Sequence, residues 1–594
     1  MTMARMAWDE ATERIRAVLR PAATVCAGVA VGLLVCAVAL AWWSRLGPPR
    51  PLGLDAWFIG GLHRWGADLP SRIPLAVTVV ALLLIAAMVS VRQRGRAGRH
   101  LPGIPVILVS LAVLVFFAYF TQGIPAFYRT LTQAYPVTPA LAAGVAAWLL
   151  CVAGAIATLL ATAAFARLGR DSLRLVAVGV VIAVVAGVVV TVGALRAGDD
   201  DRFVDASMAA ATDVPALPSA LGRRGFGLTV PDAFDAEAPG AIGGKPGHYQ
   251  IAAAGAGFVV YTNHRVTAYG IDGTERWHYA RTGQSDVVVD GISVYDNGAT
   301  VVVSLGRALV ALDAVTGAKL WTSADPRLLE AVGHAGDRDV PFLVFRDVAS
   351  WTRFDTRTGR SAWTVPDPNP SECADGEIDA DTRSWVVSIA RCTSTAGVDI
   401  RLIALDPASG HTQWDTTVLH AARPQEHQQQ EGGPLDVIAA PANSVGVFLQ
   451  FDGFGAPQAP SYANIARKTV TALPEQGFPQ PSLGPSDEFV VSDRQLTLFG
   501  ADGKQRCTVG RNVSGLNSRV PGRAAGLSYL AFPRSFVVAD RGIQPALRTF
   551  DSTTCAESGE VPAAAVEGMI PVPGAVLVLR RDGQNLLIDG YRAA

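Results

Sequence analysis

Apolar residues in the first third of the chain gather into five long runs with almost no charge inside them. At about 1.5 Å of rise per helical residue, each run can cross a hydrocarbon layer of about 30 Å. The first run exceeds the apolar core of a signal peptide and four more follow it, so we interpret it as an anchor. Residues 1–195 are therefore predicted to form an all-α membrane domain of five transmembrane helices, at 21–43, 73–91, 104–120, 139–165 and 173–195.

Arginines between the runs predict the orientation of this domain. The N-terminal arm and the connections 92–99 and 167–174 are rich in arginine, whereas the 119–137 loop holds only Arg129. Positive residues collect on the cytoplasmic side of a membrane. The 44–72 loop is an exception, with four arginines. We expect a multi-pass protein of the inner (plasma) membrane, with a cytoplasmic N-terminus and an extracytoplasmic C-terminal domain.

The sequence changes character twice after the last run. Residues 196–247 are rich in Ala, Pro, Gly and Asp without a lasting apolar period, so they are predicted to be an extracytoplasmic linker. From residue 248 to 594, short stretches of Val, Ile, Leu, Phe and Tyr alternate with Gly, Asp and Asn. That pattern is typical of strands and turns, and it predicts an all-β domain.

A short motif recurs in the β half. An acidic turn, a glycine and, four residues later, a tryptophan occur in "YGIDGTERW", "LDAVTGAKLW", "FDTRTGRSAW" and "LDPASGHTQW". The glycines lie 44, 42 and 51 residues apart, a period that predicts the blades of a β-propeller. The glycine permits a positive φ and the tryptophan ring docks on the next blade. The predicted blade-docking residues are Gly273, Trp277, Gly317, Trp321, Gly359, Trp363, Gly410 and Trp414.

Weaker copies extend the series. In "LFGADGKQRC", Cys507 stands in the tryptophan position after Gly503, and in "FDSTTCAESG", Cys555 stands in the glycine position. One eroded unit fits around 445–470, and "AVLVLRRDGQNLLIDGY" offers two closing strands without a third. The predicted count is eight blades, with seven as the alternative.

Composition and charge narrow the function. Of the 594 residues, 50% are hydrophobic and 17% are charged, and the formal net charge is -1. No excess of positive charge is available to bind nucleic acid, so nucleic acid is not an expected partner. The predicted partners are the lipid bilayer and other membrane or envelope proteins. No motif supplies catalytic residues or metal ligands, so neither a cofactor nor a metal is expected.

The stretch "ALDAVTGAKLW", 311–321, resembles the repeat of the pyrroloquinoline-quinone (PQQ) type propellers. That family includes quinoprotein dehydrogenases and non-catalytic members such as the assembly lipoprotein of the bacterial outer-membrane barrel machinery. Membrane-bound quinoprotein dehydrogenases are similar in plan, so the resemblance leaves a PQQ-dependent sugar or alcohol dehydrogenase as the alternative. The chain has only four lysines and lacks the adjacent Cys-Cys pair of the alcohol-oxidising enzymes, which favours a protein that is not an enzyme.

The membrane half has a fainter resemblance to the type 2 phosphatidic acid phosphatases. It rests on "PLGLDAWFIGGLHRWGADLPSRI", 51–73, and on "YPVTPALAAG", 135–144, which stands where that family has a Pro-Ser-Gly-His motif. The histidines and cations that phosphoryl chemistry needs are missing from these positions. The resemblance implies a degenerate phosphatase fold kept as a membrane platform, and five unrelated spans are the alternative.

These patterns predict a scaffold for protein–protein interactions in the assembly or maintenance of a bacterial cell envelope, facing the periplasm. Its partner-binding site is predicted in "FDGFGAPQAPSY", where the repeat is most eroded, at Phe451, Phe454 and Tyr462. Packing of these aromatic side chains in an eroded core is the alternative.

Four of the seven cysteines lie in the β half, in a compartment where disulfides persist. The stretch 373–392 is typical of a hairpin centred at 382.5, which places Cys373 opposite Cys392. Cys507 then pairs with Cys555, where a covalent bond replaces the missing aromatic docking. Four unpaired thiols are the alternative.

Overall fold

The computed structural model separates into two compact units, Met1–Phe203 with Gly283–Val287, and Val204–Thr282 with Val288–Ala594. The structure describes residues 2–46, 69–96, 128, 132–133, 135–161, 172–231, 233, 249–282, 287–335, 341–347, 349–369, 373, 378–393, 397–422, 436–452, 458–474, 478–480, 486–492, 495–509, 529–541, 544–564 and 566–592.

The first unit is helical. Its main described helices are α1 (Thr2–Leu46), α2 (Leu69–Arg96), α5 (Pro139–Ala161) and α6 (Ser172–Ala197), followed by the short helix η3 (Asp200–Phe203). Three segments are long and apolar enough to cross a membrane: Pro21–Ser44, Pro139–Ala161 and Ser172–Ala197. The apolar stretch in α2, Leu75–Ala86, is shorter, and the predicted span 104–120 lies outside the described residues. Three apolar spans are thus supported, and the count of five stays a prediction.

Small residues bring α1 and α6 into close contact. A side chain on Gly28 would collide with the backbone of α6 at Val176, and one on Gly187 would collide with the Cys36 sulfur. Such small residues let two helix backbones approach closely in a membrane. Because the contacts advance together along both helices, α1 and α6 run in the same direction.

The helix α5 runs against α1. Gly154 lies against Leu34, whereas Gly144, ten residues earlier in α5, lies against Ser44, ten residues later in α1. The contacts therefore advance in opposite senses along the two helices. Buried alanines from both helices fill the seam between them.

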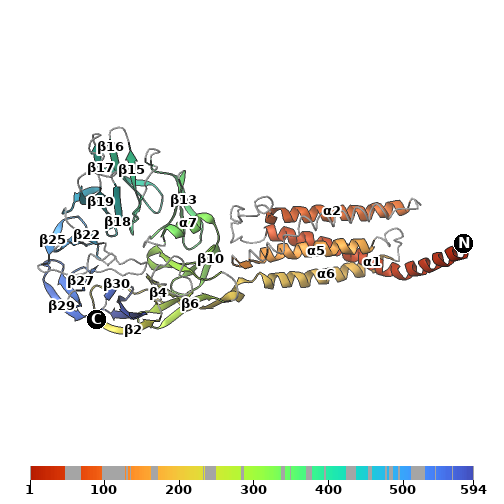
Figure 1. Cartoon of the computed structure of the whole chain (residues 1–594), viewed down its shortest axis with the longest axis horizontal. Helices are drawn as coiled ribbons and strands as arrows, with labels where there is room; N and C mark the ends of the chain where they lie inside the picture. The colour runs from red at the N-terminus through yellow and green to blue at the C-terminus, as the bar shows by residue number, and fades with distance from the viewer. Residues whose placement is uncertain are drawn as a thin grey trace. The chain divides into compact units, whose positions relative to one another are not determined.

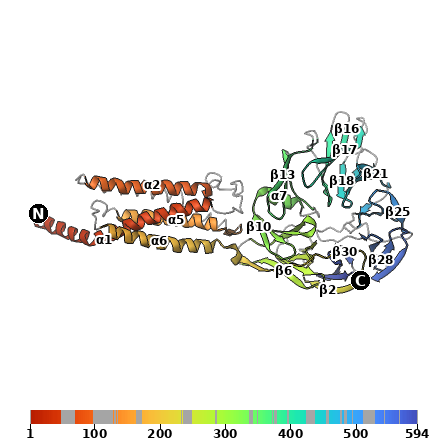
Figure 2. The same ribbon diagram turned by 180° about the vertical axis from the view of Figure 1, so that it is seen from behind.

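The second unit is a β-propeller of eight blades arranged around a common centre (Figure 1, Figure 2). This confirms the predicted count of eight and rules out seven. We number the blades in chain order and give the strands of each from the centre of the propeller outward.

The first four blades are blade 1, with β3 (Gln250–Ala254), β4 (Gly257–Thr262), β5 (Arg265–Gly270), β6 (Glu275–Arg281) and β1 (Val204–Ser207); blade 2, with β7 (Gly291–Tyr295), β8 (Thr300–Ser304), β9 (Leu309–Asp313) and β10 (Lys319–Ser323); blade 3, with β11 (Leu343–Arg346), β12 (Ser350–Phe354) and β13 (Ser361–Pro366); and blade 4, with β14 (Ile378–Asp379), β15 (Val386–Thr393), β16 (Gly397–Leu405) and β17 (Thr412–Ala422). The other four are blade 5, with β18 (Asp436–Pro441), β19 (Gly446–Asp452), β20 (Gln458–Asn464) and β21 (Thr469–Ala472); blade 6, with β22 (Phe478–Gln480), β23 (Phe489–Ser492), β24 (Leu496–Phe499) and β25 (Gln505–Thr508); blade 7, with β26 (Tyr529–Ala531), β27 (Ser535–Asp540), β28 (Ala546–Asp551) and β29 (Glu557–Pro562); and blade 8, with β30 (Val566–Val572), β31 (Ala575–Asp582), β32 (Asn585–Arg592) and β2 (Arg223–Val230).

Blade 3 departs from the common pattern. Its described sheet has three strands, and the helix α7 (Pro326–Ala335) precedes them. Leu328, Ala331 and Val332 of α7 are buried in one cluster with Leu343 of β11. The alternating strand pattern did not predict this helix.

The ring closes with a strand from the predicted linker. β2 pairs antiparallel with β32, from Arg223 opposite Arg592 to Val230 opposite Leu586. β1 pairs with β6 as a fifth strand of blade 1. The prediction that residues 196–247 only link two domains is therefore wrong, because the last blade takes its outer strand from this segment. The C-terminus lies beside β2 in Figure 1.

Apolar faces of neighbouring blades form the core of the propeller. Ile400 of blade 4 packs in one buried cluster with Leu449 of blade 5. Phe258 of blade 1 shares another cluster with Leu577 of blade 8. Each blade therefore buries its faces against its neighbours, as radial repetition requires.

Candidate functional site: the blade junctions

The turn between the third and fourth strands carries the repeated motif. In blade 2, the Asp313 carboxylate accepts hydrogen bonds from the Thr316 amide and hydroxyl, both at 3.0 Å, and Gly317 has a φ of 75°. In blade 4, the Ser409 hydroxyl donates to Asp406 at 2.6 Å. This bond, with backbone amides of the turn, holds the pKa of the Asp406 carboxyl below its usual range. The aspartates thus build the turn on which the next element rests.

Each tryptophan docks on the turn of the following blade. The indole Nε1–H of Trp277 in blade 1 donates a 2.9 Å hydrogen bond to the Ala314 carbonyl in blade 2. Its ring covers Gly317, where a Cβ atom would lie 2.7 Å from the ring Cγ. A tryptophan therefore pairs with the glycine of the next copy of the motif and not with the one in its own copy.

The same junction recurs twice without a change of chemistry. The indole Nε1–H donates at 2.8 Å to the carbonyl three residues before the glycine that the ring covers. The equivalent sets are Trp321 with Thr356 and Gly359, and Trp363 with Pro407 and Gly410. Trp414 is half-buried in the apolar cluster that contains Ile465, in the turn of blade 5.

The junction of blades 5 and 6 replaces tryptophan by tyrosine. The Tyr462 hydroxyl donates to the Ala501 carbonyl at 3.0 Å, and the Asn464 amide donates to the same oxygen at 2.5 Å. Tyr462 and Thr471 flank the glycine of this turn, Gly503. A phenol on the third strand thus supplies the donor that an indole supplies elsewhere, and the sequence motif missed it.

The junction of blades 8 and 1 closes the ring. Phe226 of β2 lies over Gly273, whose added Cβ would come within 2.7 Å of the ring. Arg592 Nε donates to the Ile271 carbonyl of the same turn at 2.9 Å. Gly273 is therefore a docking position whose aromatic partner comes from the segment predicted to be a linker.

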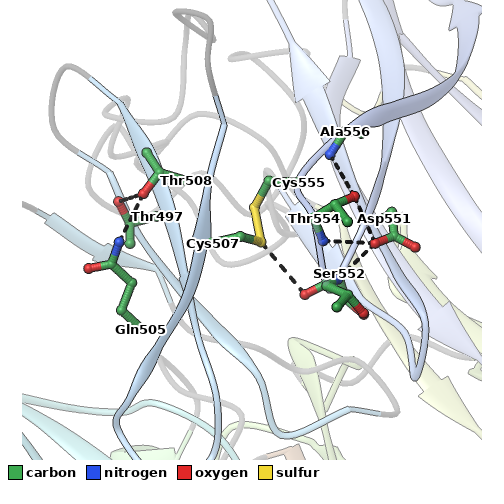
Figure 3. Close-up of a disulfide and its surroundings, with 10 residues drawn as sticks. Thr497, Gln505, Cys507, Thr508, Asp551, Ser552, Thr554, Cys555 and Ala556 are labelled. Carbon is green, nitrogen blue, oxygen red and sulfur yellow. Dashed lines mark hydrogen bonds between the residues drawn. A yellow bond between two sulfur atoms is a disulfide. The ribbon is translucent and has the colours of Figure 1, made fainter.

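A disulfide occupies the junction of blades 6 and 7 (Figure 3). Cys507 of β25 stands in the tryptophan position, and Cys555 stands in the glycine position of the next turn with a φ of 55°. The Cys507 sulfur lies 3.6 Å from the Ser552 carbonyl oxygen, three residues before Cys555. This oxygen is the counterpart of the one that accepts the indole hydrogen bond elsewhere. The Cys507 sulfur thus lies where the indole nitrogen lies at the other junctions, but as a disulfide sulfur it has no proton to donate.

The second disulfide, Cys373–Cys392, lies within blade 4. The sequence favours this pair, but the hairpin register predicted for it is wrong. Ile378 pairs with Ile389 and Asp379 with Ser388, so the hairpin is centred at 383.5, one residue later than expected. Cys373 lies before β14 and reaches Cys392 from outside the ladder.

The predicted partner-binding aromatics are not on the surface. Phe451 exposes 4% of its surface in the core between blades 4 and 5, and Tyr462 exposes none. Phe454 lies outside the described residues. The prediction of an exposed site is wrong for Phe451 and Tyr462, because both side chains are used to pack one blade on the next.

The charged side chains of the described residues do not gather into a metal site. Among them, no group of three His, Cys, Asp or Glu side chains could hold a metal ion. The buried Arg548 contacts Asp540, Glu557 and Glu560 at 2.7 to 2.9 Å, so its charge is used inside blade 7. The expectation of no cofactor stays a prediction.

The chain also does not match one feature of the quinoprotein alcohol dehydrogenases. Their adjacent Cys-Cys pair has no counterpart, because the two disulfides join residues 19 and 48 positions apart.

Comparison with known proteins supports the repeat assignment. The family described as outer membrane protein assembly factor BamB matches residues 262–440. This range contains three of the tryptophan junctions, those of Trp277, Trp321 and Trp363. No curated protein gives a significant sequence match to the chain.

Solved structures with similar folds share little sequence with the chain. BamB from Moraxella catarrhalis is 14% identical, with a TM-score of 0.33, over 63% of this chain and 98% of that protein. The quinohemoprotein alcohol dehydrogenase from Comamonas testosteroni is 12% identical, with a TM-score of 0.29, over 50% of this chain and 64% of that one. Likeness at this level says nothing about activity.

The blade count, the turn motif and the family match all concern the same half of the molecule. The motif explains the junctions one by one, and the match covers the blades in which the motif is best kept. The second unit of this chain is a PQQ-like β-propeller of eight blades.

Proposed function

We propose that the chain is a membrane-anchored scaffold whose propeller lies outside the cytoplasm and binds other proteins during assembly or maintenance of the cell envelope. The observation that carries the proposal is the match of residues 262–440 to the BamB family. Two disulfides in the propeller support a compartment in which such bonds persist. The junction residues, which are buried or half-buried, serve the scaffold by fixing its shape.

The directions of the described helices support the five-span topology. Trp42 Nε1 near the end of α1 donates to Thr78 Oγ1 near the start of α2, so these helices are antiparallel. α2 then ends on the side where α1 begins, whereas α5 begins on the side where α1 ends. The five-span topology accounts for this arrangement with one further crossing at 104–120, which lies outside the described residues.

Two reporter fusions test this crossing. A fusion after residue 100 is expected to behave as cytoplasmic, and a fusion after residue 130 as extracytoplasmic. Alkaline phosphatase activity, normalised to the amount of fusion protein, measures both. Equal behaviour of the two fusions would mean that the chain does not cross the membrane at 104–120. That result would contradict the five-span topology and the extracytoplasmic propeller.

Site-specific photo-cross-linking tests the scaffold. A benzoyl-phenylalanine at Val470 or Val214, which expose 41% and 54% of their surface on the propeller, should yield adducts with extracytoplasmic proteins in intact cells. Val189 of α6, which is 65% exposed, is the matched control and should yield a different set of adducts.

Two results would contradict the scaffold. One is the absence of any adduct specific to the propeller positions. The other is a purified protein with the absorbance of a bound quinone and with sugar or alcohol oxidation toward an artificial electron acceptor, which would establish the dehydrogenase instead.

A further inference from the structure

We propose that the redox state of the Cys507–Cys555 disulfide controls how tightly blades 6 and 7 are joined. Reduction of this bond loosens the junction between the two blades, which is called the seam below. The bridge joins the outer strand of one blade to the turn of the next, in the positions that Trp277 and Gly317 occupy at the first junction. At the junction of blades 1 and 2 an indole docks without a covalent bond. The junction of blades 6 and 7 instead has a disulfide, which a thiol can break. The proposal concerns the seam alone and does not rest on which partners the propeller binds.

The seam has other contacts, so reduction is expected to loosen it without unfolding the propeller. The Tyr529 hydroxyl donates to the Glu488 carbonyl across the junction at 3.1 Å. Leu498 of blade 6 and Phe550 of blade 7 are buried in one apolar cluster that also contains Cys555. These contacts do not depend on the bridge and remain when it is broken.

The backbone of Cys555 favours opening once the bond is broken. Its φ of 55° lies in the left-handed region, which is unfavourable for a residue with a side chain. At the other junctions this position is mostly glycine, as in Gly317, Gly359, Gly410 and Gly503. The disulfide therefore holds a turn conformation that cysteine does not favour by itself.

The reaction is an ordinary thiol–disulfide exchange with a dithiol reductant. Its thiolate attacks the sulfur of Cys507, which is half-exposed, while Cys555 is buried. The Cys507–Cys555 bond breaks, Cys555 leaves as a thiolate and takes a proton, and a mixed disulfide forms on Cys507. The second thiol of the reductant then displaces Cys507, which leaves two protein thiols and one oxidised reductant.

The other disulfide is a matched internal control. Cys392 belongs to β15 and Cys373 precedes β14, so that bridge lies within one blade. Its reduction removes no contact between neighbouring blades. Loosening of the 6–7 junction should therefore follow the state of Cys507–Cys555 alone.

The test is hydrogen exchange of the full chain in lipid nanodiscs, with and without a dithiol. Reduction should speed exchange in 505–508 and 551–562 by about tenfold or more, and leave the Trp277 junction unchanged. The double variant Cys507→Trp with Cys555→Gly rebuilds the docking of the other junctions. Its exchange should be slow in this region and insensitive to the dithiol.

Mass spectrometry of the alkylated cysteines reports the redox state in each sample. Unchanged exchange after reduction of Cys507 and Cys555 would overturn the proposal, and so would a bond that resists reduction while the protein is folded. It would also be overturned if the Cys507→Trp, Cys555→Gly variant responded to the dithiol as strongly as the unchanged protein. The Cys373→Ser with Cys392→Ser variant must keep the dithiol response; a variant without the response also rejects the proposal.

Discussion

The indole of Trp277 lies over Gly317 and donates its Nε1–H to the Ala314 carbonyl at 2.9 Å. Trp277 is fully buried, although it belongs to blade 1 and its partners belong to blade 2. One side chain thus satisfies a backbone oxygen and fills the space above a glycine at the same junction. The propeller repeats this relationship, with different side chains, around much of its ring.

Gly317 is predicted to tolerate no side chain. In Gly317→Ala, the new Cβ would lie 2.7 Å from the Trp277 ring at a φ of 75°, so we expect a loss of more than about 1 kcal/mol of stability. Gly333→Ala in α7 is the control, because nothing lies within 4 Å of that position. Urea denaturation of both variants in detergent gives the comparison. A Gly317→Ala midpoint equal to that of the control would refute the docking argument.

Replacing Trp277 separates the ring contact from the hydrogen bond. Trp277→Phe keeps an aromatic ring and loses the bond to Ala314, which should cost about 1 kcal/mol. Trp277→Ala also loses the buried ring and should cost about 3 to 5 kcal/mol. Denaturation midpoints measure both, and equal losses would mean that the ring contributes nothing beyond its N–H.

Acid should weaken the turns. The Ser409 hydroxyl bond holds the pKa of Asp406 low, and the Thr274 hydroxyl bond does the same for Asp272. A carboxyl whose folded pKa lies below its unfolded value stabilises the fold above the unfolded value, and this stabilisation is lost as pH falls through the folded pKa. The loss should begin below about pH 4. Ser409→Ala should start less stable at pH 7 and lose less on acidification; an unchanged pH slope would contradict this.

Phe226 is predicted to hold the ring closed. Phe226→Ala should speed hydrogen exchange in β32 and in the turn around Gly273, because that turn loses its aromatic cover. Thr229→Ala, at an exposed position of the same strand, is the matched control and should leave exchange unchanged. If the two variants behave alike, closure does not depend on this contact.

The sequence predicted the parts of the propeller whose signals are local. The spacing of Gly317 and Trp321 within one motif was enough to find the blades, since every copy carries its own turn and strand. The Cys507–Cys555 pair also followed from position in the repeat. Neither inference required knowledge of which residues meet across the ring.

Signals that depend on distant partners were missed. β2 pairs with β32 from the opposite end of the propeller sequence, and only the two-residue alternation of Phe226, Leu228 and Val230 marked it as a strand. Tyr462 was assigned to an exposed loop because turn residues precede it. In the structure it is buried, because its hydroxyl replaces a missing indole at Ala501.

The location of the C-terminus tests the central claim most directly, because the scaffold, the disulfides and the membrane topology all require an extracytoplasmic propeller. Alkaline phosphatase and green fluorescent protein, each fused after Ala594, report the two possible sides. The account predicts an active phosphatase fusion and a dark fluorescent fusion. A fluorescent fusion with an inactive phosphatase would place the propeller in the cytoplasm and contradict the account.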